Sequence, residues 1–127
     1  MRNKSAVPGN GTRSGDWNPI ERLKDYTKDG VDAAALFPNF ARFTGDPLGI
    51  IKDRDIRLAC IQAYNDWLAE EFCKPDPQRL IPLALIPPWD VELAKAEAER
   101  SARKGHRGAI FGAALDVFGY TPTWDKY

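Results

Sequence analysis

The histidine content of this chain limits the chemistry that it could perform. His106 is the only imidazole in the 127 residues. A catalytic zinc site uses about three protein ligands from His, Asp, Glu or Cys and keeps one position open. One histidine excludes the imidazole-rich form of such a site. Although histidine is the ordinary proton switch near neutral pH, we expect His106 to be an exposed or packing residue.

Two pairs of carboxylates could suggest acid–base chemistry. Asp53 and Asp55 stand at the expected start of a long helix, where acidic groups favour the helix dipole. Glu70 and Glu71 fall on the solvated face of the same helix. We therefore interpret both pairs as structural.

Other candidate groups also have structural interpretations. Cys60 and Cys73 lie 13 residues apart on one expected helix, about 20 Å at the rise of an α-helix, whereas a disulfide needs Cα atoms within about 7 Å. Reduced cytosolic thiols are therefore expected. Asn65 is a poor helix former, so we expect its side chain to bond a neighbouring loop. The aromatic residues favour packing over a ligand box: Trp67, Phe72, Trp89 and Trp124.

Composition indicates one globular domain of modest size. Hydrophobic residues make up 43% of the chain, and 18 basic residues balance 18 acidic ones. Without a basic surface we expect no nucleic-acid partner, and no apolar run reaches the ~18 residues that a membrane span needs. The start of the chain is basic but lacks the apolar core of a secretory signal. A cytoplasmic protein is the expectation.

Helical and strand patterns alternate along the chain. Residues 1–16 are rich in Gly, Asn and Ser and are expected to be a flexible loop or tail, while residues 17–127 form the domain. Helices are expected over 19–28, from about 53 to the prolines at 75 and 77, and from 90 to about 104. Apolar runs predict strands at 31–37, 80–86 and 109–111, the first buried on both faces. Pro82 is expected at the entry of its strand, before full pairing.

The alternation predicts an α/β fold with about three parallel strands and connecting helices. Two architectures are compatible with this order: a doubly wound open sheet and an arc of a (β/α)8 barrel. No Gly-rich phosphate loop follows the first expected strand, which counts slightly against a nucleotide-binding sheet.

Several ordered blocks resemble the amidohydrolase-related family of metal-dependent hydrolases, in its aminocarboxymuconate-semialdehyde decarboxylase-like branch. The resemblance covers roughly residues 16–125. Its blocks are Asp16-Trp17-Asn18-Pro19 with Arg22-Leu23, Asp29-Gly30-Val31-Asp32, Leu36-Phe37-Pro38, Tyr64-Asn65-Asp66-Trp67-Leu68, Pro77-Gln78-Arg79-Leu80 and Gly105-His106-Arg107-Gly108.

The resemblance implies a (β/α)8 barrel with a divalent metal, usually zinc, acting in decarboxylation or hydrolysis. The family's ligands are a His-x-His pair on the first strand, single histidines after the fifth and sixth strands, and an Asp after the eighth. None can be placed here if the three expected strands match family strands 2 to 4. A complete barrel takes ~250 residues, about twice this length. We therefore expect a partial barrel with no metal ligand and no catalytic residue of its own, inactive alone.

Barrel geometry gives the candidate substrate-binding residues. Active sites of such barrels lie at the carboxyl ends of the strands. Asn39 and Phe40 follow the first expected strand, Trp89 follows the second, and Phe111 ends the third. Family members often carry Tyr-Pro-Thr where this chain has Phe37-Pro38-Asn39, so the substrate is left open beyond a small molecule.

The alternative is a small non-catalytic α/β module. Three strands leave two sheet edges, and unprotected edges favour association. Such a module would bury its edges by forming a homo-oligomer.

Overall fold

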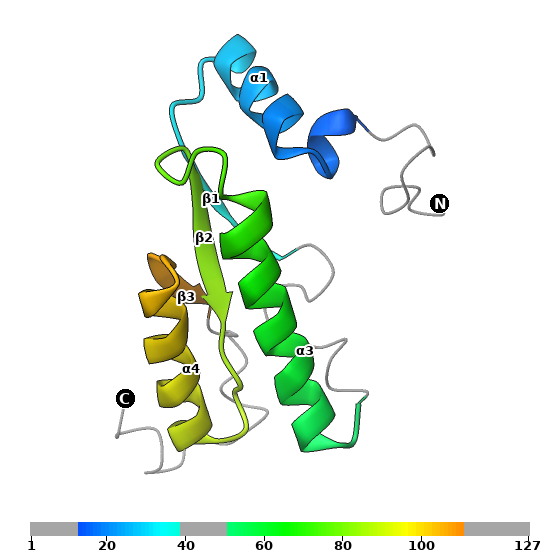
Figure 1. Ribbon diagram of the computed structural model, residues 1–127, viewed down its shortest axis with the longest axis vertical. Helices are drawn as coiled ribbons and strands as arrows, with labels where there is room; N and C mark the ends of the chain where they lie inside the picture. Colours follow the sequence, from blue (N-terminus) through cyan, green and yellow to red (C-terminus); the bar gives the residue numbers. More distant parts are fainter. Residues whose placement is uncertain (1–12, 39–50, 111–127) are drawn as a thin grey trace.

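The computed structural model of the protein describes residues 13–38 and 51–110. Within these ranges three parallel strands form one sheet, in the order β1-β2-β3 (Figure 1). The strands are β1 (Ala34–Leu36), β2 (Leu80–Leu85) and β3 (Gly108–Ile110). The predicted α/β fold class with three parallel strands is confirmed.

Helices connect the strands. The described helical segments are a 3-10 turn η1 (Ser14–Asp16), α1 (Pro19–Asp29), α3 (Arg54–Trp67), a π-helical turn η2 (Leu68–Phe72) and α4 (Val91–Arg103). In Figure 1, α3 and α4 flank β2 and begin at the end toward which its arrow points. Both helices therefore run opposite to the strands, as the crossover between parallel strands requires. None of these helices is long and apolar enough to cross a bilayer.

Helix α1 begins and ends where its sequence predicts. The Asn18 side chain accepts from the backbone N–H groups of Ile20 and Glu21, and Pro19 occupies the first turn. Gly30 ends the helix with φ of 72°, and the Val31 N–H then donates to Tyr26 O over 2.8 Å. This is the Schellman cap, which favours glycine because L side chains are strained at positive φ.

Part of the segment that was expected to be a flexible tail is folded directly before α1. Within the expected tail of residues 1–16, Ser14–Asp16 form the turn η1, and Gly15 is buried. Gly15 O accepts a hydrogen bond of 2.6 Å from Arg22 Nε on α1. Residues 1–12 lie outside the described part of the chain.

Strand β1 is shorter than the predicted strand at 31–37. The carbonyl groups of Val31 and Asp32 accept from the Arg79 guanidinium over 2.9 and 2.8 Å, so a side chain and not a neighbouring strand binds this backbone. Ladder pairing covers only Ala34–Leu36. The expected burial on both faces is wrong for this strand, since Ala35 is exposed.

The long helix after β1 does not stay α-helical to its end. Asp53 caps α3 by accepting from Asp55 N and Ile56 N. After Trp67 the turn widens, and Cys73 N–H donates to Leu68 O, five residues earlier. The wider π turn allows Leu68, Phe72 and Cys73 all to be buried against Leu80.

Pro82 lies inside β2 and not at its entry. It is in register with Leu36 of β1, so the expected position was wrong. Its carbonyl accepts from Arg107 N over 3.2 Å, so its backbone faces the β3 edge. Because β3 begins only at Gly108, the missing N–H of the proline costs no bond within that strand.

Helix α4 and its two ends agree with the sequence. Asp90 accepts from Leu93 N at the start. At the other end Gly105 takes φ of 98°, and His106 N–H donates to Ser101 O over 3.1 Å. Arg100 and Arg103 lie in the last turn, where positive charge favours the helix dipole.

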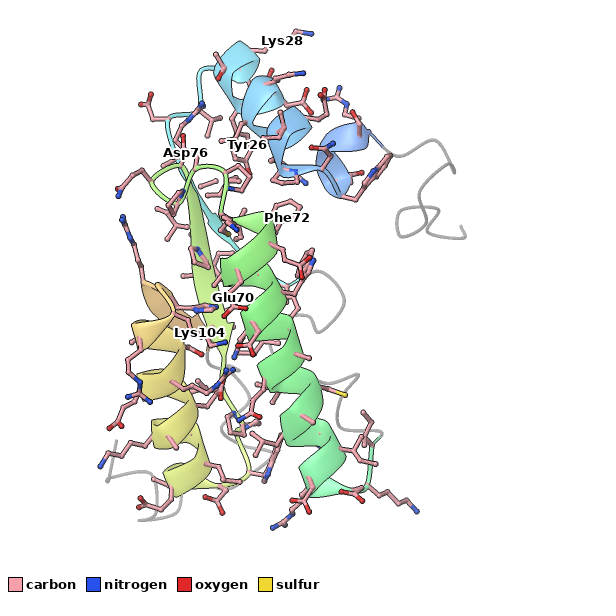
Figure 2. The ribbon with its side chains drawn as sticks, viewed as in Figure 1. Tyr26, Lys28, Glu70, Phe72, Asp76 and Lys104 are labelled. Carbon is pink, nitrogen blue, oxygen red and sulfur yellow. The ribbon has the colours of Figure 1, made fainter. Side chains whose placement is uncertain are left out.

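Among the described residues, two apolar clusters form the core. The first joins Leu68, Phe72, Cys73 and Leu80, with α1 residues Leu23 and Tyr26 packed against it. Figure 2 shows Tyr26 and Phe72 at the end of the molecule where β2 begins. The second cluster joins Ile61, Leu85 and Ile110, with Trp89 packed against it. It lies where β2 and β3 end, so it supports the edge at which barrel enzymes bind substrates.

Candidate functional site

Trp89 lies at the carboxyl edge of the sheet, the position from which the sequence analysis predicted a substrate-binding role. It follows β2 and packs against the cluster of Ile61, Leu85 and Ile110, of which Leu85 ends β2 and Ile110 ends β3. Its ring nitrogen Nε1 is buried and has no hydrogen-bond partner among the described residues. The other predicted substrate-binding residues, Asn39, Phe40 and Phe111, lie outside the described ranges.

Arg57 accompanies Trp89 and was missed by the sequence analysis. Its guanidinium carbon lies 4.7 Å from the centroid of the Trp89 ring, which is a cation–π contact. Its Nε donates to Ile51 O over 3.0 Å, and its Nη2 donates to the same carbonyl. The only sequence signal was the position of Arg57 near the start of a helix that follows a strand, which places it at the carboxyl edge.

The described residues do not fit a catalytic metal. Within residues 13–38 and 51–110, no three or more His, Cys, Asp or Glu side chains gather closely enough to bind an ion. His106 lies between the end of α4 and the start of β3, away from the carboxyl edge of the sheet, and its Nδ1 lies 3.1 Å from Ser101 O. The chain contains no other histidine.

His106 is a buried packing residue. It is 8% exposed, and its Nε2 has no hydrogen-bond partner among the described residues. Burial lowers the pKa of His106 below its usual value, because the imidazolium would lose its hydration; the bond to Ser101 O and the Glu97 charge oppose this only in part. Of the two alternatives that the sequence left open, exposed or packing, the structure shows the second.

A group of polar residues joins α3 to α4, and we call it the α3–α4 clasp. Its members are Asn65, Asp66, Glu97, Arg100 and Lys104. Asn65 and Glu97 are 0% and 2% exposed, and Asn65 Nδ2 donates to Glu97 Oε1 over 2.7 Å. Arg100 bonds both Glu97, at 2.8 Å, and Asp66, at 2.6 Å.

Lys104 extends the clasp toward solvent. Its Nζ lies 2.9 Å from Asp66 Oδ1 and 2.7 Å from Glu70 Oε1, and Figure 2 shows Glu70 and Lys104 meeting between the two helices. Glu70 is therefore part of a surface ion pair and not of a catalytic carboxylate pair. Asn65 has the structural role that was predicted, but it bonds strand β2 and helix α4 instead of a loop.

The charges of the clasp set the pKa values of its carboxylates. Burial works to raise the pKa of Glu97, but the hydrogen bonds from Arg100 and Asn65 outweigh it and hold that pKa below its usual value. For Asp66 burial likewise opposes ionisation, and the bonds from Lys104 and Arg100 lower its pKa. Glu97 and Asp66 are therefore ionised at neutral pH, and the clasp has the character of a structural network.

The cysteines and aromatic residues near η2 are structural as well. Cys60 and Cys73 are free thiols, and burial raises the pKa of Cys73 to about 11, which keeps its thiol protonated and unreactive. The rings of Trp67 and Phe72 contact each other in a tilted arrangement, with centroids 5.4 Å apart. Phe72 and Cys73 pack in the cluster around Leu80. Trp124 lies outside the described residues.

The amino-acid sequence matches the model of one known family along most of the chain. The family described as amidohydrolase matches residues 7–119. No curated protein matches the sequence. The matched span covers all three parallel strands and their helices, which agrees with an arc of a (β/α)8 barrel and not with a nucleotide-binding sheet. The chain belongs to the amidohydrolase family.

Proposed function

We propose that this chain is a segment of a metal-dependent amidohydrolase-type enzyme that decarboxylates or hydrolyses a small carboxylate-bearing substrate. In this proposal β1, β2 and β3 correspond to barrel strands 2 to 4 of the whole enzyme. The observation that supports it is the three-stranded parallel sheet of this family with Trp89 and Arg57 at its carboxyl edge.

The metal ligands are proposed to lie outside this chain. One histidine and no ligand cluster in the described ranges do not satisfy a site that needs about three protein ligands. The length of 127 residues is about half of the ~250 that a complete barrel uses. A divalent metal, zinc in the usual form of the family, would supply Lewis-acid help in the complete enzyme.

The residues of this chain would bind and orient the substrate. Trp89 offers an apolar aromatic face at the rim, and Arg57 places a positive charge beside it. Asn39, Phe40 and Phe111 complete the proposed rim as predictions from strand position. The proposed partner is a small molecule in the cytoplasm, with no nucleic acid or membrane involved.

Sequencing the genomic DNA on both sides of the reading frame tests this proposal. We expect an in-frame His-x-His strand upstream and histidine-bearing strands downstream. Stop codons and unrelated sequence on both sides would contradict the segment assignment.

Activity gives a second test. The 127-residue chain with added Zn²⁺ should release no CO₂ from a panel of small aromatic and unsaturated carboxylates, whereas the in-frame extended protein should do so or hydrolyse related substrates. Metal-dependent turnover by the short chain would show that the proposed inactivity is wrong.

A non-catalytic oligomerisation module is the alternative. It is favoured by the two outer strands, β1 and β3, each of which pairs with only β2 among the described residues. Light scattering after size-exclusion chromatography distinguishes the two. A discrete particle that unfolds cooperatively without metal favours the module, and aggregation that a complementary segment relieves favours the enzyme segment.

A further inference from the structure

Arg57 is a half-buried cation with no acidic partner in the described part of the chain. Ion pairs there join Arg22, Lys24, Arg100 and Lys104 to carboxylates, but none includes Arg57. Removing a charge from water is costly unless an opposite charge or strong acceptor compensates it. Arg57 has one carbonyl acceptor and one aromatic face instead.

The contacts of Arg57 fix its plane and leave one side for an acceptor. Nε and Nη2 both donate to Ile51 O, and the Trp89 ring covers one face of the guanidinium at 4.7 Å. Across residues 13–38 and 51–110, Nη1 has no hydrogen-bond acceptor. Stacking uses the face of a guanidinium and leaves its in-plane donors available for a planar oxyanion.

The position of this pair agrees with ligand binding and not with a purely structural ion. Arg57 lies in the first part of α3 and Trp89 follows β2, so both belong to the carboxyl edge of the sheet (Figure 1). The polar groups that support the fold lie farther from this edge: the α3–α4 clasp joins the later turns of the two helices, and His106 follows the end of α4. The Trp89 Nε1–H, buried without a described acceptor, is a second donor in the same packed group.

We propose that Arg57, held against Trp89, is a specificity-determining residue that binds the carboxylate of a small planar ligand. The Nη1 side of the guanidinium would donate to the carboxylate, and the Trp89 ring would pack beside the body of the ligand. The ligand class rests on the proposed function, whereas the anion site itself rests on the geometry of Arg57.

Benzoate and benzamide are suitable probes because they share shape and differ in charge. The 127-residue chain is labelled with ¹⁵N, and the indole N–H signal of Trp89, assigned with Trp89→Phe, is followed during titration. We expect benzoate to shift this signal. Benzamide should bind at least about tenfold more weakly than benzoate. Equal binding of the two probes, or no benzoate-dependent shift, would overturn the proposal.

Variants separate recognition from structure. Arg57→Gln should weaken benzoate binding at least about tenfold, and Arg57→Lys should fall between it and the parent because the charge stays and the planar fork is lost. Arg54→Gln is the matched control, because Arg54 is an exposed arginine one turn earlier on α3 and should bind benzoate as the parent does. If Arg57→Gln fails to fold by circular dichroism, the Lys variant decides: unchanged benzoate selectivity there would refute the role.

The two proposals can fail separately. Benzoate binding that depends on Arg57, combined with unrelated flanking DNA, would keep the anion site and remove the enzyme assignment. In-frame metal-binding strands combined with benzoate binding that ignores Arg57 would keep the enzyme and remove this role.

Discussion

The side-chain amide of Asn65 pairs with the peptide groups of Leu85 in both directions. Leu85 N–H donates to Asn65 Oδ1 over 2.9 Å, and Asn65 Nδ2 donates to Leu85 O over 2.8 Å. Alternate residues of β2 face alternate edges, and Arg79 O accepts from Ala34 N on the β1 side. Leu85 therefore faces the β1 edge beyond the last paired residue of β1. Asn65 therefore bonds the backbone N–H and C=O groups of Leu85, which lie beyond the part of β2 that β1 pairs with.

Replacing Asn65 should destabilise the protein strongly. Asn65→Asp keeps the size of the side chain but removes the donor to Leu85 O and Glu97, and it places two carboxylates together in a buried position. We expect the free energy of unfolding at pH 7 to fall by about 3 kcal/mol. Urea denaturation measures it. Glu99→Gln, an exposed change on α4, should stay within about 0.5 kcal/mol, and a similarly small loss for Asn65→Asp would contradict the buried pairing.

The acid side of the stability profile should depend on Glu97. Its folded pKa is lowered, chiefly because the Arg100 and Asn65 bonds outweigh burial. The unfolded chain therefore binds the proton first, so the stabilisation is complete above about pH 5 and is lost as pH falls through the folded pKa. Urea denaturation between pH 7 and pH 3 should show a flatter profile for Glu97→Gln than for the parent. Parallel profiles would mean that Glu97 contributes no proton linkage.

His106 should add a second pH dependence at a higher pH. Burial lowers its folded pKa below the unfolded value of about 6.5, so the neutral imidazole is the stabilising form. The contribution of His106 to the free energy of unfolding is then complete above about pH 7. It is lost as pH drops through 6.5 toward the folded pKa. His106→Asn should lose this change between pH 7.5 and 5.5 in thermal melts, and an NMR titration should place the pKa of His106 below 6.5. A pKa above 6.5 would reverse the sign and refute the argument.

Arg79 should hold helix α1 against the sheet. Its guanidinium donates to Val31 O, Asp32 O and Thr27 Oγ1 over 2.8 to 3.0 Å, a planar fork that lysine cannot reproduce. We expect Arg79→Lys to lower the free energy of unfolding by about 1 kcal/mol. In hydrogen-exchange measurements, the backbone amides of Arg79→Lys should exchange faster than those of the parent protein. This increase should be confined to α1 and Ala34.

The control for this prediction is Arg103→Lys, an exposed arginine on α4. It should leave exchange in α1 unchanged. Equal exchange rates in Arg79→Lys and the parent would show that α1 is held by apolar packing alone.

The sequence by itself determined the elements whose causes are local. Asn18 and Asp90 cap their helices, Gly30 ends α1, and the apolar face from Ile56 to Leu68 predicts α3, because capping oxygens, positive φ and helical periodicity act within a few residues. The alternation of these elements with apolar runs was also enough to predict parallel strands. Trp89 at the carboxyl edge followed from strand order alone.

Only the tertiary structure decided the features that join distant parts of the chain. Arg79 takes the carbonyls of Val31 and Asp32 from the predicted strand, Arg57 meets Trp89, and Asn65 completes the edge of β2. Each contact links residues more than 15 positions apart, and no local pattern records which polar group will satisfy which. Burial makes an unpaired polar group costly, so most buried donors find an acceptor. The packing of helices against strands determines which acceptor is within reach.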